Sequence, residues 1–173
     1  MSAVSSVMNS ILQSVMTAGS SAEREEVCDD DRPVKWNLPG FTGQVRVRTA
    51  FGDLPIQALR IRDEIRTAAG AIVRVQWIDK LHIDEDFLRK HSSAQPLRIP
   101  ADAFGIGRPM NDMTVSPCQP VCAEAHVASD FQSAANLCLT SRAHRLQTAG
   151  LTYYRFHCGS PTTVRAEGVW VRV

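Results

Sequence analysis

GFTGQVRVRTAFGDLPIQALRIRDEIRTAAG, residues 40–70, is the stretch that decides the fold. Within it, Val45 and Val47 alternate with Arg46 and Arg48. A period of two places the valines on one face of a strand and the arginines on the other. Glycine and aspartate follow soon after this strand, and both residue types favour tight turns. The stretch therefore predicts a β-rich meander of short strands joined by turns.

The same alternation returns further along the chain. Residues 71–83, AIVRVQWIDKLHI, form the longest strand-like run and predict that Trp77 lies in the core. Residues 151–157, LTYYRFH, predict another strand, whose expected core anchors are Tyr153 and Phe156.

Two short segments favour helix instead. In residues 131–145 a helical turn is expected to pack Leu137 and Leu139. Residues 82–91, HIDEDFLRKH, predict a short helical insertion on the surface. The side chains in this insertion that could bind a metal are those of His82, Asp84, Asp86 and His91. Their spacing fits no common ligand template, so neither a metal nor another cofactor is expected.

The N-terminal part differs from the β region. Residues 1–26 predict an amphipathic helix, and the acid-rich residues 23–32 predict a solvated linker. Pro33 closes any preceding helix, so the expected domains are 1–32 and 33–173. The apolar stripe either packs on its own domain or binds a protein partner, including a second copy of the chain. Its candidate contact residues are Val4, Met8, Ile11, Leu12 and Val15.

Composition excludes several classes of function. A net charge of +1 argues against a general affinity for nucleic acid. No apolar run approaches the roughly 20 residues that cross a bilayer, and the start of the chain lacks the basic and apolar regions of a signal peptide. The five cysteines are irregularly spaced, which favours free thiols in a reducing, cytoplasmic compartment.

Three blocks of the β region resemble Hint domains, the self-processing modules of hedgehog proteins and inteins, and the bacterial type above all. The second block is PLRIPADAF at 96–104, and the third is TVRAEGVWV at 163–171. The resemblance implies an all-β horseshoe of short antiparallel strands over about residues 36–173. The first block matches the family pattern at Phe41, Thr42, Val47, Thr49, Gly52, Pro55, Ile56 and Leu59.

The resemblance also implies a self-processing reaction, but it places other residues at the positions of the family's reacting groups. In the family a cysteine attacks the peptide carbonyl before it, and histidines polarise that bond and supply protons. Gly40 occupies the cysteine position. The family's T/S-x-x-H motif keeps Ser116 but has Gln119 in place of the histidine, and Pro161 replaces a later histidine. Residues 172–173 are Arg-Val where inteins end in His-Asn, so C-terminal cleavage is not expected.

These replacements predict a catalytically inactive Hint-like domain that acts as a structural or protein-binding subunit of a larger assembly. The alternative is a self-processing element with a displaced cysteine nucleophile. Cys118 and Cys122 lie beside the lost histidine position, and Cys158 follows His157. However, Cys122 falls in a predicted buried strand, and adjacent residues of a strand point to opposite faces.

Four arginines form two pairs, and one residue separates the two members of each pair. The role of these arginines is a second open question. They either cover a solvated outer face or form a basic stripe for a carboxylate- or phosphate-bearing partner, such as the chain's own acidic linker. These candidates are Arg46, Arg48, Arg60 and Arg62.

Overall fold

The structure, a computed structural model, describes residues 35–123 and 130–173. Residues 33–173 form one compact unit. The predicted N-terminal helix, with every residue of its apolar stripe, lies outside the described residues.

Short antiparallel strands build two sheets in the described part of the chain, as the alternating pattern predicts. Two short α-helices, α2 (Glu85–Lys90) and α3 (Ala134–Cys138), and two 3-10 turns, Ile56–Ala58 and Ser92–Ala94, connect them. The six-stranded sheet has the order β11 (His144–Arg145), β7 (Leu97–Ile99), β8 (Met113–Val115), β1 (Phe41–Thr42), β12 (Gly150–His157) and β6 (Trp77–Asp84).

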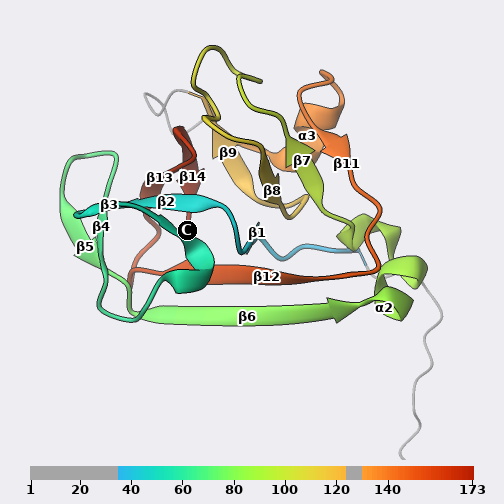
Figure 1. Cartoon of the computed structure of the whole chain (residues 1–173), viewed down its shortest axis with the longest axis horizontal. Coiled ribbons are helices and arrows are strands. Elements are labelled where there is room, and N and C mark those ends of the chain that lie inside the picture. Colours follow the sequence, from blue (N-terminus) through green and yellow to red (C-terminus); the bar gives the residue numbers. More distant parts are fainter. Residues whose placement is uncertain (1–34, 124–129) are drawn as a thin grey trace, which may run out of the picture. The chain divides into compact units, whose positions relative to one another are not determined.

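The second sheet has eight strands and includes β14, the last strand of the chain. Seven follow the order β10 (Gln132–Ser133), β9 (Pro120–Cys122), β14 (Val169–Arg172), β13 (Thr163–Ala166), β2 (Arg46–Thr49), β4 (Glu64–Arg66) and β5 (Ile72–Arg74), and β3 (Gly52–Pro55) pairs with β2. The long strands β6 and β12 lie side by side, with β2 to β5 near one end and α2 at the other (Figure 1).

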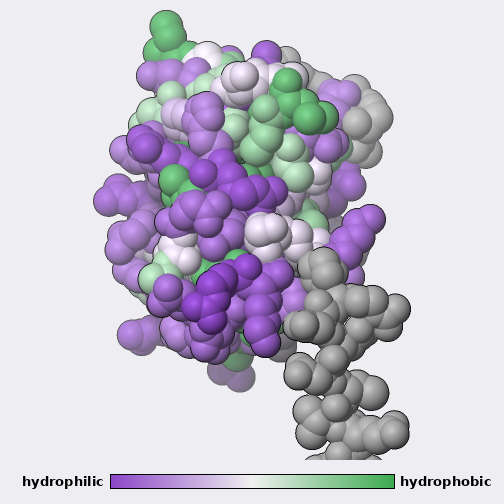
Figure 2. Space-filling view, turned by 90° about the vertical axis from the view of Figure 1, so that its right-hand side faces the viewer, coloured by the Kyte–Doolittle hydropathy of each residue, from purple (hydrophilic) through white to green (hydrophobic). Residues whose placement is uncertain are grey.

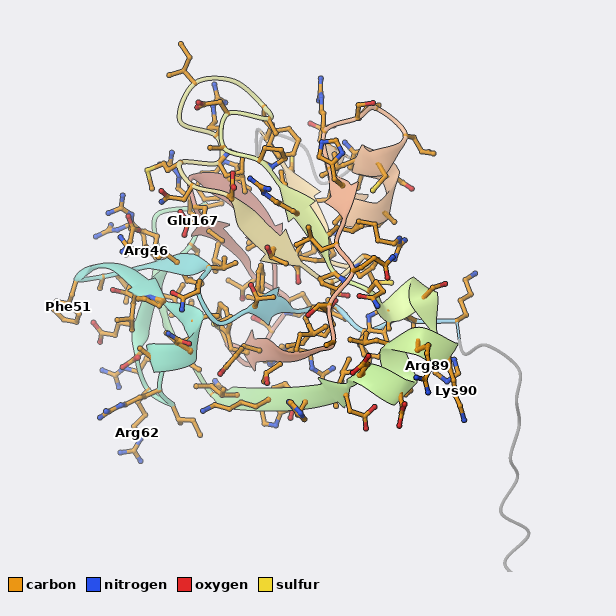
Figure 3. All side chains as sticks on the ribbon, turned by 45° about the vertical axis from the view of Figure 1, so that its right-hand side comes forward. Arg46, Phe51, Arg62, Arg89, Lys90 and Glu167 are labelled. Atoms are coloured by element: carbon orange, nitrogen blue, oxygen red, sulfur yellow. The ribbon has the colours of Figure 1, made fainter. Side chains whose placement is uncertain are left out.

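Strand β2 follows the predicted alternation. Val45 and Val47 are buried, while Arg46 is exposed. The hairpin from β2 to β3 closes at a bond from the Thr49 hydroxyl to the Gly52 carbonyl, at 2.7 Å. Phe51 projects outward at this turn and is 90% exposed (Figure 3).

The run 71–83 is not one strand, and the prediction that Trp77 is buried is wrong. The chain changes sheets within this run: Val75 N–H donates to the Asp63 carbonyl, and Gln76 N–H donates to the His157 carbonyl. This break interrupts the alternation, so Val75 is buried while Trp77 is 47% exposed. The predicted helical insertion at 82–91 is also shorter, because β6 continues to Asp84 before α2 begins.

Strand β12 supplies the two predicted core anchors to different clusters. Phe156 packs into the main core, whereas Tyr153 packs against Leu88 in a smaller cluster beneath α2. Their spacing of three residues directs the side chains to opposite faces of the strand, and both faces are covered. Of the two leucines expected to pack near α3, Leu137 is buried, but Leu139 is 85% exposed because it lies after the helix end.

Polar side chains cover much of the surface at the α2 end of the unit. Figure 2 shows hydrophobic residues there in small separate patches among hydrophilic ones. This distribution leaves the two buried clusters as the apolar interior of the unit.

Candidate functional site

Gly40 directly precedes β1, in a segment that hydrogen bonds to Ser116 hold in place. The Gly40 carbonyl accepts the Ser116 N–H at 2.8 Å. Ser116 is fully buried, and its hydroxyl donates to the Leu38 carbonyl. The indole N–H of Trp36 donates to the same hydroxyl at 2.9 Å. These bonds hold the segment that contains the peptide bond between Pro39 and Gly40.

Residue 40 has little room for a side chain. A Cβ atom there would lie 3.2 Å from the Cβ of Tyr153 and 3.4 Å from the Cγ of Arg155. Contacts this short require a shift of a few tenths of an ångström, so the site is packed around the glycine. With only hydrogen atoms at this position, Gly40 offers no nucleophile to the preceding carbonyl.

Gln119 has a structural role in the same region. Its side chain is 1% exposed, and its amide nitrogen donates to the Arg172 carbonyl at 3.0 Å and to the Pro120 carbonyl at 3.3 Å. A carboxamide does not exchange a proton near neutral pH as an imidazole does. The side chain therefore ties the start of β9 to the end of β14.

Gly40, Gln119 and Pro161 border one cavity of about 330 Å³, although they are far apart in the sequence. Arg172 and Val173 border it as well. The three positions at which the resemblance predicts the family's nucleophile and histidines therefore converge, and these three residues themselves supply no attacking atom and no titratable acid or base.

Three further residues border this cavity and were not identified from the sequence. They are Trp77, Arg155 and His157. The register of β6 and β12 places Trp77 opposite His157 and Arg155 opposite Asp79, with which it forms an ion pair. The Arg155 guanidinium also lies 5.4 Å from the centre of the Trp77 ring. Only the pairing of two strands that are distant in sequence brings these groups together.

His157 is the imidazole of the cavity. Its Nδ1 accepts the Gly159 N–H at 2.9 Å, which requires an unprotonated Nδ1. An imidazole without a neighbouring nucleophile can exchange a proton with a ligand, but it cannot by itself form an acyl intermediate.

No described cysteine borders the cavity. The Cys118 thiol donates to the Trp36 carbonyl at 3.1 Å, and burial raises its pKa, an effect that the charge of Lys35 only partly opposes. Burial also raises the pKa of Cys158. Cys122 is buried in β9, as expected. Because the thiolate is the nucleophile, the two raised pKa values hold Cys118 and Cys158 in the unreactive form near neutral pH.

The four candidate arginines do not form a single stripe. Arg46 and Arg48 lie on β2, and the Arg48 Nε pairs with the Asp53 carboxylate at 3.1 Å. Arg60 and Arg62 lie in the loop before β4, where Arg62 has a φ of 78° and projects away from the sheet (Figure 3). The spacing of Arg60 and Arg62 is that of two residues on one face of a strand, but both lie in a loop.

The residues considered for metal binding take other contacts. Asp84 caps α2 by accepting the Phe87 N–H at 2.8 Å, and Asp86 pairs with Arg89. The His82 Nδ1 lies 3.2 Å from the Thr152 hydroxyl oxygen. Across residues 35–123 and 130–173, no three histidine, cysteine or acidic side chains group in a way that could hold a metal. Neither described α-helix has the length and apolarity to cross a membrane.

Comparison with solved structures finds the same fold in inteins. The solved structures most similar in fold include the gp41-1 intein, with a TM-score of 0.53 at 8% identity, covering 79% of this chain and 100% of the intein. The MchDnaB-1 intein has a TM-score of 0.52 at 11% identity, covering 77% of this chain and 99% of the intein. A DnaB intein from Synechocystis sp. PCC 6803 has a TM-score of 0.53 at 9% identity, covering 79% of this chain and 99% of the intein.

These likenesses establish the fold, and the sequence establishes the family. Comparison with curated protein sequences finds no match. The sequence model of the Hint domain, in contrast, matches residues 39–172, which begin and end at the cavity described above. The predicted all-β Hint fold is confirmed, and the chain belongs to the Hint domain family.

Proposed function

We propose that this Hint domain is catalytically inactive and serves as a structural or protein-binding subunit of a larger assembly. The observation that carries the proposal is the replacement of the reacting groups around one cavity. Gly40 has no side chain, and the Gln119 amide is committed to two main-chain carbonyls. This chemistry supports inactivity, because an acyl shift needs an attacking atom and a proton donor.

The binding part of the proposal rests on what the domain retains. The hydrogen bonds around Ser116 and the packed core persist without the groups of the reaction. A rigid β unit of this kind presents fixed surface residues to a partner. The N-terminal segment, with its predicted apolar stripe, is the second expected contact.

Intact-mass measurement tests catalytic inactivity. The purified full chain is incubated with dithiothreitol and, separately, with hydroxylamine, both of which cleave thioesters. We expect the 19.1 kDa chain to stay whole in both. A fragment that begins at Gly40 would instead identify the domain as a self-processing element with a displaced cysteine.

Co-purification tests the binding part. The full chain and a variant that lacks residues 1–26 are each isolated from the native source. We expect the full chain to bring a stoichiometric protein partner and the shortened chain to lose it. Recovery of the full chain as a monomer without a partner would refute the subunit role, whatever the mass measurement gives.

A further inference from the structure

Three arginines face one another where β2, β4 and β13 meet. The pairing of Val47 with Ala166 places Arg48 opposite Arg165, one residue along the register. The pairing of Thr49 with Ile65 likewise places Arg48 opposite Arg66. Beyond the end of β2, the bridge from Thr67 to Val164 brings Arg66 opposite Arg165. Three strands thus each direct one guanidinium group to the same junction.

A cavity of about 340 Å³ lies at this junction, and all three arginines border it. Trp170 and Thr67 also border it, while its lining contains no carboxylate. This cavity is separate from the one at Gly40, because the two share no lining residue. The inference therefore does not depend on catalytic inactivity.

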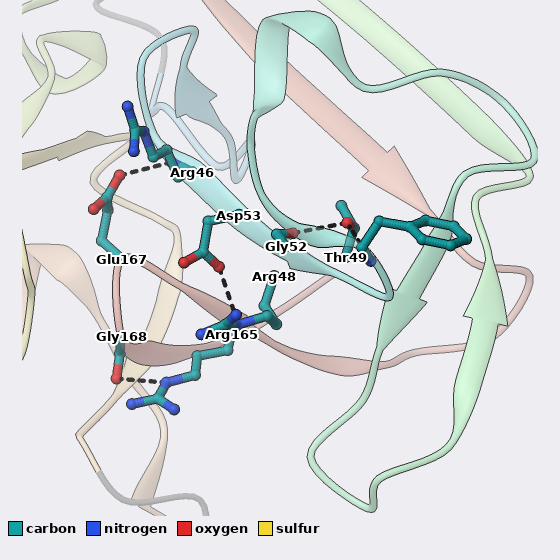
Figure 4. A network of polar contacts seen from close by, with 9 residues as sticks. Arg46, Arg48, Thr49, Gly52, Asp53, Arg165, Glu167 and Gly168 are labelled. Atoms are coloured by element: carbon teal, nitrogen blue, oxygen red, sulfur yellow. Dashed lines mark hydrogen bonds and ion pairs between the residues drawn. The ribbon is translucent and has the colours of Figure 1, made fainter.

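The charges around the cavity are only partly balanced. Arg48 pairs with Asp53, and Arg165 donates through Nε to the Gly168 carbonyl at 3.2 Å (Figure 4). The Arg66 guanidinium makes no hydrogen bond or ion pair with a described residue, although its backbone pairs with β5. Three guanidinium groups and one carboxylate leave a local charge of +2. Like charges placed directly across neighbouring strands destabilise a sheet, and a bound anion would offset that repulsion.

An unsatisfied hydrogen-bonding group lies beside these charges. The Thr67 hydroxyl is buried and has no hydrogen-bond partner among the described residues. Leaving such a group unpaired costs free energy, which an oxygen ligand would recover. Because the hydroxyl is covered, the atoms that cover it must move for a ligand to reach it.

We propose that this cavity binds the phosphate group of a phosphate monoester. The second ionisation of a phosphate monoester gives it a charge close to −2 near neutral pH, which matches the local charge. Its three terminal oxygens can each accept from a guanidinium group that approaches from a different strand. A carboxylate is planar and is satisfied by one arginine in a bidentate pair, so it would leave the other two without a partner.

Titration of the full chain with O-phosphoserine, inorganic phosphate and serine tests the site, with potassium chloride at matched ionic strength as the salt control. The readout is the NMR shift of arginine Nε–H signals in the unaltered chain, so no variant is needed for the first result. We expect saturable shifts of Arg48, Arg66 and Arg165 with both phosphates and none with serine or chloride. Equal affinity for the two phosphates would identify free phosphate as the ligand, and tighter binding of O-phosphoserine a phosphorylated side chain.

Variants then locate the binding. Arg66→Gln and Arg165→Gln should each raise the Kd for O-phosphoserine about tenfold, because each removes a charge-assisted contact. Arg60→Gln removes an exposed arginine outside the cavity and should leave the Kd unchanged. The proposal is overturned if no shift saturates, if all three variants bind equally, or if a short DNA duplex, whose phosphates are diesters, binds more tightly than O-phosphoserine.

Discussion

The side-chain amide of Gln119 donates a hydrogen bond to the main-chain carbonyl of Arg172 at 3.0 Å. The two residues are 53 positions apart in the sequence, and the bond joins the start of β9 to the end of β14. Gln119 thus contributes to holding the eight-stranded sheet together.

Gln119→Leu should destabilise the domain. Leucine keeps the apolar volume but leaves the Arg172 carbonyl without its donor in a buried place, which typically costs about 1–3 kcal/mol. Urea unfolding measures the change in the free energy of unfolding. Gln147→Leu, at an exposed position, is the control and should stay within about 0.5 kcal/mol of the unaltered chain. Equal effects of the two substitutions would contradict the structural role of Gln119.

Gly40→Cys should fold but should not cleave itself. The new Cβ must displace Tyr153 slightly, which typically costs about 1 kcal/mol or more in a packed site. The thiol would then border the cavity without a histidine at residue 119 or 161 to polarise the bond or to donate a proton. Intact-mass measurement with hydroxylamine is expected to find one species.

The double variant Gly40→Cys with Gln119→His separates two explanations of the proposed inactivity. If the double variant cleaves before residue 40 and the single variant does not, the loss of both groups is responsible. Cleavage by the single variant would show that the missing thiol alone blocks the reaction.

Glu167→Gln should also be destabilising, although it changes only one atom. The Glu167 carboxylate is buried and accepts the Arg46 N–H at 2.8 Å through one oxygen and the Asn111 amide at 2.9 Å through the other. A glutamine has only one acceptor oxygen, so its amide must face one of the two donors. The expected loss is about 1.5–3 kcal/mol by urea unfolding. Glu85→Gln, on the exposed face of α2, is the control, and a similar loss there would refute the argument.

The family blocks predicted the all-β fold and three of the residues that border the Gly40 cavity, because those signals are local. The alternation in β2 is one example, and its buried valines followed from period alone. The exposure of Trp77 could not be predicted, because the chain changes sheets at Val75 and Gln76 and this break has no local sequence signal.

The sequence also did not predict which residues lie opposite one another on neighbouring strands. Arg48, Arg66 and Arg165 are distant in sequence, and only the registers of three strands bring them to one cavity. The spacing that linked Arg60 and Arg62 to β2 was misleading, since both residues lie in a loop. The periodicity of the sequence predicts which face of a sheet a residue lies on. Only the pairing of the strands determines which residues lie next to it.

Alkylation should be slow at Cys118 and should accelerate with rising pH. Burial raises the pKa of this thiol, so the thiolate fraction at neutral pH is smaller than that of an ordinary cysteine. Iodoacetamide labelling resolved by site with mass spectrometry measures the rate from pH 7 to pH 10. The rate at Cys118 should still be rising above about pH 9, where an unperturbed thiol is largely ionised. Rapid labelling of Cys118 at pH 7 in the folded chain would revive the displaced-nucleophile alternative.

Asp112 should make the stability of the domain depend on pH in the acid range. Its carboxylate accepts the Ala101 N–H at 2.8 Å and the Arg98 Nε–H at 2.9 Å. These two partners, the Ala101 N–H first, lower the pKa of Asp112 in the folded state. Because the pKa of Asp112 is lower in the folded chain than in the unfolded chain, the ionised carboxylate stabilises the fold. This stabilisation is fully present above the pKa of the unfolded chain, about 4, and is lost as the pH falls through the pKa of the folded chain. The difference in unfolding free energy between the unaltered chain and Asp112→Asn should therefore be constant above about pH 5 and shrink below about pH 4.

The same comparison in an Arg98→Gln background ranks the two partners of Asp112. Because the Ala101 N–H is the larger cause of the lowered pKa, part of the pH dependence should survive without the guanidinium. The Ala101 N–H is an uncharged donor that lies just after β7. Its hydrogen bond favours the ionised form of the Asp112 carboxyl even when no positive charge is near. Complete loss of the pH dependence in the Arg98→Gln background would assign the effect to the ion pair instead.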